Sequence, residues 1–165
     1  MDQINKILAP TDFSELSQAG VRYALHLAQA LGAEVTIYHV VNYEEITAYR
    51  EWMEEGAMAN STFRPPQQLL ERCRLALDQF LKDHFSDLMP WVKVHKKVEL
   101  GVPYKNIVEE AKREGADLIV LATHGRTGLS HALLGSVTEK VVRNAPCPVL
   151  SIRPQLAASA AQKAA

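Results

Sequence analysis

One stretch of the sequence, residues 117–142, most strongly constrains how this chain folds. It opens with Leu118–Ala122, a short, wholly apolar run typical of a strand buried on both faces of a sheet. It closes with an S-x-x-E pattern at residues 136–139, which predicts a capping box and a helix through residue 144. The loop between them contains Gly125, Gly128 and Gly135. Because free N–H groups and the positive end of a helix dipole point into such a loop, the stretch predicts an anion-binding site.

The rest of the chain alternates between strand-like and helix-like segments. Strands are predicted at residues 4–9, 35–41, 92–100, 118–122 and 149–152. The first helix is predicted to begin near Asp12 or Ser14 and to end at Gly32. Further helices are predicted at residues 69–85, 103–112 and 136–144. This alternation predicts a parallel sheet flanked by helices, and the lysines of the third strand indicate an edge or half-exposed position.

Two segments fall outside this alternation. Residues 42–68 form a long connection, which begins with an acidic, helix-prone piece at residues 44–56. A connection of that length is usually a lid, a partner surface or a disordered loop, and the sequence leaves these three open. The tail, residues 155–165, has too little apolar mass to pack, so we expect it to be disordered. That leaves one domain over residues 1–154.

Composition narrows the class of protein. Hydrophobic residues make up 47% of the 165-residue chain and charged residues 22%, as in ordinary globular proteins. A formal net charge of −1 removes the electrostatic argument for nucleic-acid binding. The sequence has neither a membrane-length apolar run nor a secretory signal pattern, and Cys73 and Cys147 form no C-x-x-C motif. We therefore expect a cytoplasmic protein with reduced thiols that binds neither nucleic acid nor membranes.

The glycine spacing matches neither the P-loop nor the dinucleotide-binding pattern. It reads A-T-H-G, nine further residues, then G-S. This resembles the universal stress protein family, whose nucleotide-binding members carry G-x2-G-x9-G-[ST]. Gly125 matches the second glycine, Gly135 the third and Ser136 the hydroxyl residue, whereas Ala122 stands at the first position. The resemblance covers about residues 4–153 and includes A-P-T-D-F-S and N-A-P-C-P-V-L.

The resemblance implies a single doubly wound α/β domain of the adenine-nucleotide-hydrolase-like kind, with a five-stranded parallel sheet in the order 3-2-1-4-5. In such a sheet, ligands bind outside the carboxyl ends of the strands where the chain reverses direction, here between strands 1 and 4. The implied ligand is an adenine nucleotide, and Val40 would contact it through its backbone. The predicted lining is Pro10, Thr11, Asp12, Val40, Ala122, Gly125, Arg126, Gly135, Ser136, Val137 and Thr138.

Charge indicates which form of the nucleotide needs a metal ion. ATP carries about four negative charges, whereas a helix N-terminus offers about half a positive charge. Arg126 adds one positive charge, so a bound triphosphate is expected with Mg²⁺ or Mn²⁺. Ser136 and Thr138 supply the nearest side-chain oxygens for the metal. AMP or ADP carries less negative charge to be neutralised and is expected to bind without a metal ion.

Several of these residues have a purely structural alternative. Ser136 and Asp12 are also suited to capping helices, and Gly125 and Gly135 are also suited to positive φ or close packing. For His39 and His124 we favour a structural role, because neither has a second histidine or carboxylate at ligand spacing.

Ala122 adds one methyl group where the family pattern has glycine. If that methyl points into the crevice, the nucleotide must shift. If it points into the sheet, nothing changes.

The resulting hypothesis is a regulatory protein of the stress response that binds ATP or AMP. One alternative is a slow ATPase, although no general base with an orienting partner is evident. The other is an interaction module with a vestigial crevice. A homodimer is also expected, through the short apolar edge strand at residues 148–152, and the family commonly dimerises this way.

Overall fold

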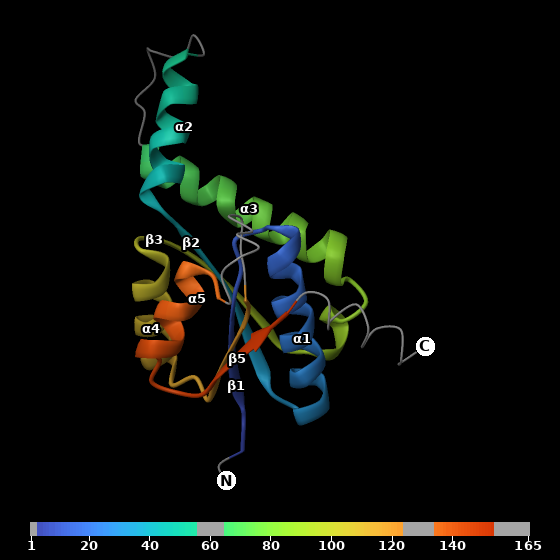
Figure 1. Cartoon of the computed structure of the whole chain (residues 1–165). Coiled ribbons are helices and arrows are strands. Elements are labelled where there is room, and N and C mark those ends of the chain that lie inside the picture. Colours follow the sequence, from blue (N-terminus) through green and yellow to red (C-terminus); the bar gives the residue numbers. More distant parts are fainter. Residues whose placement is uncertain (1–2, 56–64, 124–133, 154–165) are drawn as a thin grey trace.

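A computed structural model of the 165-residue chain describes residues 3–55, 65–123 and 134–153 (Figure 1). Its centre is a sheet of five parallel strands in the order β3-β2-β1-β4-β5. The strands are β1 (Lys6–Pro10), β2 (Glu34–Val41), β3 (Val94–Leu100), β4 (Leu118–Ala122) and β5 (Val149–Ile152). The predicted fold class and strand order are confirmed, and β3 and β5 are the two edges.

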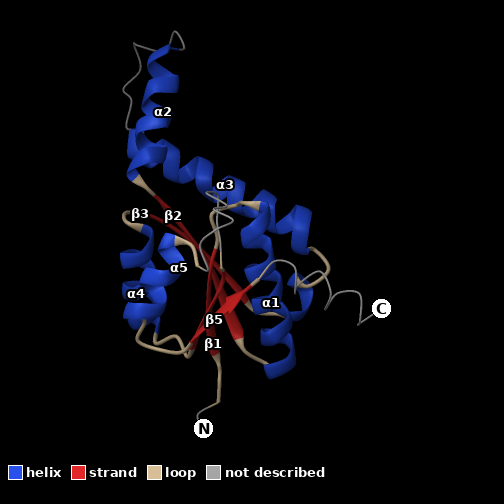
Figure 2. Cartoon of the chain, in the orientation of Figure 1, coloured by secondary structure: helices blue, strands red, loops and turns tan. Residues whose placement is uncertain are grey.

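Helices cover both faces of this sheet (Figure 2). They are α1 (Glu15–Leu31), α2 (Tyr43–Glu55), α3 (Pro65–Phe85), α4 (Pro103–Glu114) and α5 (Ser136–Asn144), with a short 3₁₀ turn, η1 (Met89–Trp91). In Figure 1, α1 and α3 lie on one face, and α4 and α5 on the other. Helix α2 continues from the carboxyl end of β2 and stands out from the body. Within the described residues, no helix is both long and apolar enough to cross a membrane.

The long connection begins, as its composition indicated, with a helix, α2. Its end differs from the prediction, because α3 begins at Pro65 instead of near Leu69. Proline fits the first turn of a helix because the N–H it lacks has no intrahelical acceptor there. Residues 56–64 lie outside the described part of the chain, as does the tail predicted to be disordered.

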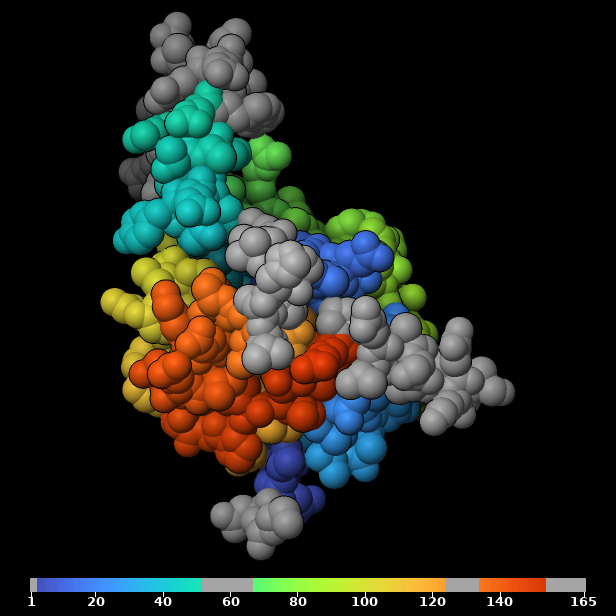
Figure 3. Space-filling model, in the orientation of Figure 1, coloured from blue at the N-terminus to red at the C-terminus, as the bar shows by residue number. Residues whose placement is uncertain are grey.

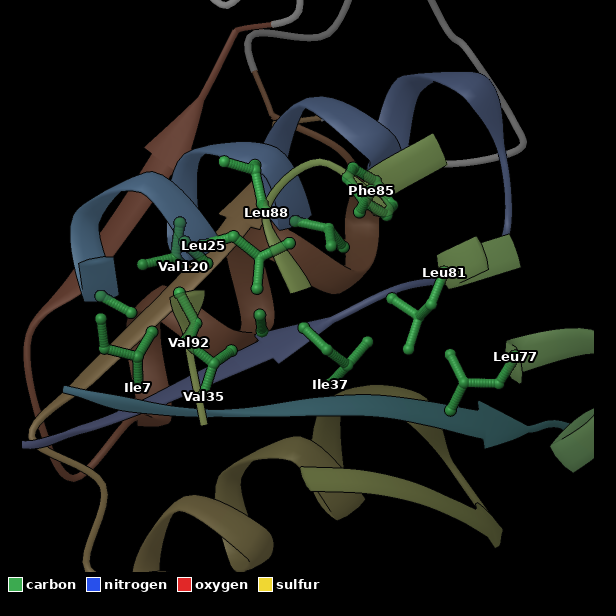
Figure 4. Packing of buried hydrophobic residues seen from close by; sticks show 14 of the residues in the cluster. Ile7, Leu25, Val35, Ile37, Leu77, Leu81, Phe85, Leu88, Val92 and Val120 are labelled. Atoms are coloured by element: carbon green, nitrogen blue, oxygen red, sulfur yellow. The ribbon is translucent and has the colours of Figure 1, made fainter. Parts of the chain in front are cut away.

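The core has two layers, one on each face of the sheet. The larger layer packs α1 and α3 against the strands, and Leu25, Leu77, Leu81 and Phe85 are all at most 2% exposed (Figure 4). The smaller layer packs α4 and α5 against Leu8, Ile119 and Leu121. Strand β4 contributes to both layers, which explains why its sequence is wholly apolar.

Two helix ends confirm the sequence predictions. Gly32 and Gly115 follow α1 and α4 with φ values of 68° and 63°, the left-handed conformation that favours glycine. At the start of α1, the Ser14 hydroxyl accepts a hydrogen bond from the Ser17 N–H, at 3.1 Å. Ser14 is therefore the cap, and Asp12 supports it by accepting bonds from the Ser14 N–H and hydroxyl.

The predicted capping box at the start of α5 is wrong. The Glu139 N–H donates to the Gly135 carbonyl at 2.9 Å, so Gly135 is the N-cap and Ser136 is already the first helical residue. The Glu139 carboxylate pairs instead with Arg143, one turn further along the helix. Helix entry one residue earlier leaves Ser136 exposed at the first turn.

Candidate functional site

A crevice of about 570 Å³ opens at the carboxyl end of the sheet, where β1 and β4 lie side by side. This is the point at which the chain reverses direction across the sheet, where ligands of such folds bind. The described residues that line it are Pro10, Thr11, Asp12, Ser17, Tyr38, His39, Val40, Asn42, Glu44, Glu45, Ala48, Pro103, Ile107, Leu121, Ala122, Gly135, Ser136, Val137 and Thr138. The volume lies within the range of small-molecule sites.

Most predicted site residues meet at this crevice. Pro10, Thr11 and Asp12 follow β1, Val40 lies near the end of β2, and Ala122 ends β4. Gly135, Ser136, Val137 and Thr138 bring in the start of α5. Gly125, Arg126 and His124 lie outside the described residues.

The prediction missed one whole wall of the crevice. Asn42 and the first turns of α2, with Glu44, Glu45 and Ala48, lie along it. The signal was present in the sequence, because an acidic, helix-prone piece follows directly after the second strand. That strand ends at the same sheet edge as the predicted site.

The start of α5 faces the crevice with backbone donors. A helix offers no internal acceptor to its first N–H groups, here those of Ser136, Val137 and Thr138. Gly135 holds this end in place by donating from its N–H to the Thr123 carbonyl, at 2.7 Å. Its φ of −67° is ordinary, so the site does not need glycine for a positive φ. The N–H groups and the helix dipole together suit an anion.

Thr138 is tied to the strand beside it. Its side chain is buried, and its hydroxyl donates to the Ala122 carbonyl at 2.9 Å. The bond joins α5 to the end of β4 across the floor of the crevice. The hydroxyl proton is therefore used within the protein, whereas Ser136 is exposed.

The methyl group of Ala122 is directed away from the α4 and α5 side of the sheet. Alternate residues of a strand face opposite sides, and Ile119 and Leu121 belong to the core layer under α4 and α5. Ala122 shares its face with Leu118 and Val120, which pack on the α1 side. A methyl group on the α1 side of the sheet does not project toward the start of α5.

The turn after β1 is tightly bonded. Phe13 has a φ of 63°, which is uncommon for a residue with a side chain. The turn is held because the Phe13 N–H donates to the Thr11 hydroxyl at 3.1 Å, and that hydroxyl also bonds the Ser17 hydroxyl at 2.9 Å. The Asp12 carboxylate, which accepts from Ser14, is thereby fixed at the edge of the crevice.

His39 links three parts of the site. Its ring is buried, and Nδ1 lies 2.8 Å from the Thr11 carbonyl, which requires Nδ1 to be the donor. Nε2 lies 4.0 Å from a Glu45 carboxylate oxygen on α2. The ring also stacks on Phe13 with a centroid distance of 4.1 Å. These contacts are structural ones, and they also bring the Glu45 carboxylate near a histidine that has no carboxylate at ligand spacing in the sequence.

Tyr38, at the back of the crevice, belongs to a charged network on β3 and α4. Its hydroxyl donates to Glu99 at 2.6 Å, and Glu99 pairs with Arg113 at 2.9 Å. Burial, followed by the bond to Glu99, raises the pKa of Tyr38 well above its ordinary value. Burial alone would raise the pKa of Glu99, but the bonds from Tyr38 and Arg113 outweigh it and lower that pKa. Tyr38 is therefore held as a neutral donor to Glu99.

The described residues contain no group of three or more His, Cys, Asp or Glu side chains placed to hold a metal ion. Of the two residues predicted to lie near a metal, Thr138 already donates its hydroxyl to the Ala122 carbonyl, whereas the Ser136 side chain is exposed.

Comparison with known proteins agrees with this geometry. A sequence model of the universal stress protein family matches residues 3–153. The universal stress protein MJ0531 of Methanocaldococcus jannaschii is 36% identical over 90% of this chain and 81% of its own length.

Among solved structures, that of MJ0577, a universal stress protein of the same organism, has a TM-score of 0.67 at 32% identity. The comparison covers 92% of this chain and 97% of that one. A structure of a universal stress protein in complex with cAMP has a TM-score of 0.59 over 93% of this chain and 99% of that one. Its identity of 22% supports the shared fold alone.

Fold and crevice thus define a doubly wound α/β protein with a crevice at its topological switch point. The family match over nearly the whole described chain makes the identification specific. The chain belongs to the universal stress protein family.

Proposed function

We propose that this protein binds an adenine nucleotide, ATP or AMP, in the crevice between β1 and β4 and acts as a regulatory protein in the stress response. The observation that carries the proposal is the start of α5, whose N–H groups face a crevice at the switch point of the sheet. A universal stress protein with this fold has been solved in complex with cAMP, so the fold can accommodate an adenine nucleotide.

The nucleotide would lie with its phosphates at α5 and its base toward Val40 and Asp12. Gly125 and Arg126 complete the proposed lining from the loop before α5. A triphosphate would bring Mg²⁺ or Mn²⁺, with Ser136 as the nearest side-chain oxygen and Thr138 as the second candidate. The metal would neutralise phosphate charge that the half charge of a helix end does not balance.

From the described lining we expect any hydrolysis of ATP to be slow. A general base needs a proton acceptor aimed at the reacting group and a partner that orients it. The Asp12 carboxylate accepts from Ser14, and the two ring nitrogens of His39 face Thr11 and Glu45. We therefore expect hydrolysis far below the ~1–10³ per second typical of enzymes.

One experiment separates the three candidate functions. The purified protein is denatured and any released nucleotide is identified by chromatography, after which added ATP is followed over hours. Nucleotide that is bound and left intact supports the proposal. Steady turnover of the added ATP would identify an enzyme. A protein that is empty and does not respond to ATP would be an interaction module.

A variant that tests the proposed phosphate site is Gly135→Val, whose binding of ATP and Mg²⁺ would be measured by calorimetry. Valine is compatible with a φ of −67°, so we expect a folded protein whose stability falls by about 1 kcal/mol through the poorer N-cap. Its side chain should fill space that a phosphate needs and abolish binding. Val142→Ala, at an exposed position on the same helix, is the control and should bind normally. A folded Gly135→Val protein that binds ATP like the parent would contradict the proposed phosphate site.

A further inference from the structure

The start of α2 is fixed by a reciprocal pair of hydrogen bonds. The Asn42 side-chain oxygen accepts from the Glu45 N–H at 2.9 Å, and the Glu45 carboxylate accepts from the Asn42 N–H at 2.8 Å. This N-x-x-E capping box closes the first turn of the helix. Because Asn42 directly follows β2, the wall that α2 forms is held to the end of the sheet.

Further contacts orient the same helix. Glu45 lies near the buried His39, which is bonded to the end of β1. Ile46 and Tyr49 pack against the core, and the Arg72 guanidinium of α3 lies 5.2 Å from the centre of the Tyr49 ring. In Figure 3, α2 stands above the surface formed by α4 and α5, which contribute the opposite wall. These contacts therefore hold the acidic first turn of α2 in position beside the crevice.

The charged residues among the described lining are all acidic. They are Asp12, Glu44 and Glu45, and that part of the lining contains neither lysine nor arginine. The N-terminus of α2 contributes about half a positive charge, less than its two carboxylates remove. A crevice of about 570 Å³ is on the order of 10 Å across, close to the screening length at 0.1 M ionic strength. A charge on the α2 wall therefore acts on a ligand bound at α5.

We propose that the acidic start of α2, through Glu44 above all, makes this crevice select its nucleotide by charge. The proposal rests on the nucleotide-binding function proposed above. A ligand with one phosphate group, or a triphosphate neutralised by Mg²⁺, binds in preference to a metal-free triphosphate. The carboxylates repel each added phosphate charge, whereas they accept hydrogen bonds from ribose hydroxyls or an adenine amino group.

Glu44 is the residue to change, because its side chain is exposed and Glu45 caps the helix. Calorimetry would measure the affinities of Glu44→Gln and parent for AMP and for ATP in EDTA. At a separation of roughly 10 Å, removing one wall charge should strengthen ATP binding about threefold more than AMP binding at 0.01 M ionic strength. The difference should fall below about twofold at 0.1 M.

Glu51→Gln is the matched control, because it removes the same charge from an exposed position of α2 outside the described lining. It should leave the ratio of the two affinities unchanged. If Glu44→Gln alters AMP and ATP binding equally, or if Glu51→Gln has the same effect, charge selection by α2 is wrong while nucleotide binding stands. A parent protein that binds neither nucleotide would overturn both proposals.

Discussion

The packing of α1 against β4 makes Gly20→Ala a sharp test of the crevice floor. In an exposed helix this change stabilises by about 1 kcal/mol. Here a Cβ on residue 20 would lie 2.7 Å from the Ala122 nitrogen and 3.0 Å from the Leu121 carbonyl carbon. Both are backbone atoms of a central strand, which cannot rotate away. To restore ordinary contact, the helix and the strand must separate by about 0.7 Å.

The energetic cost follows from that separation. Overpacking a core typically costs about 1–3 kcal/mol. The crowded atoms are backbone, so we expect the upper part of that range. After the gain in helix propensity, a net loss of about 1–2 kcal/mol remains. For a chain of this size, the loss lowers Tm by roughly 2–8 °C. Nucleotide affinity should fall too, because Ala122 carries the carbonyl to which Thr138 of α5 is bonded.

Differential scanning calorimetry and ATP titration would measure both effects. Gln29→Ala, at an exposed position of the same helix, is the control and should leave both properties close to those of the parent. A Gly20→Ala protein at least as stable as the parent would refute the close approach of α1 to β4. A less stable protein with unchanged affinity would refute the link from Ala122 to the site.

Two further predictions concern α5 and the free edge of the sheet. Thr138→Val should cost about 1–3 kcal/mol in the free energy of unfolding, because it leaves the Ala122 carbonyl without its hydroxyl donor. Thr138→Ser should retain most of that stability in chemical denaturation, and equal losses for both variants would contradict this role of the bond. The protein should also dimerise through β5, and Ser151→Pro should give monomers in light scattering. The Pro148 and Ile152 carbonyls bond to β4, so the alternating backbone directs the Ser151 N–H to the outer edge. A monomeric parent at micromolar concentration would rule the dimer out.

The sequence was most informative where one physical requirement dominates a segment. A strand buried on both faces needs an unbroken apolar run, and Leu118–Ala122 has one. Helices that end in the left-handed conformation favour glycine, and Gly32 and Gly115 end α1 and α4. The strand order came from the resemblance to a family, because the alternation of strands and helices alone leaves several orders open.

Prediction failed where two local patterns compete for the same residues. Ser136 to Glu139 fits a capping box, but it equally fits the first turn of a helix that starts one residue earlier. In the structure Gly135 is the N-cap, and its N–H bonds to Thr123, a residue outside the local pattern. In the α2 wall, the local pattern was unambiguous but its place in the fold was not. Its capping box, Asn42 to Glu45, was present in the sequence, but its place beside the crevice depends on contact with His39.

The walls of the described crevice are each tied to the end of a strand. Thr138 ties α5 to β4, His39 ties the end of β1 to α2, and Gly135 is bonded to the residue that follows β4. Each wall is thus held by a bond or close contact at the end of a strand. Walls held in this way favour the binding function proposed above, because a crevice that is already ordered loses less conformational freedom when a ligand enters.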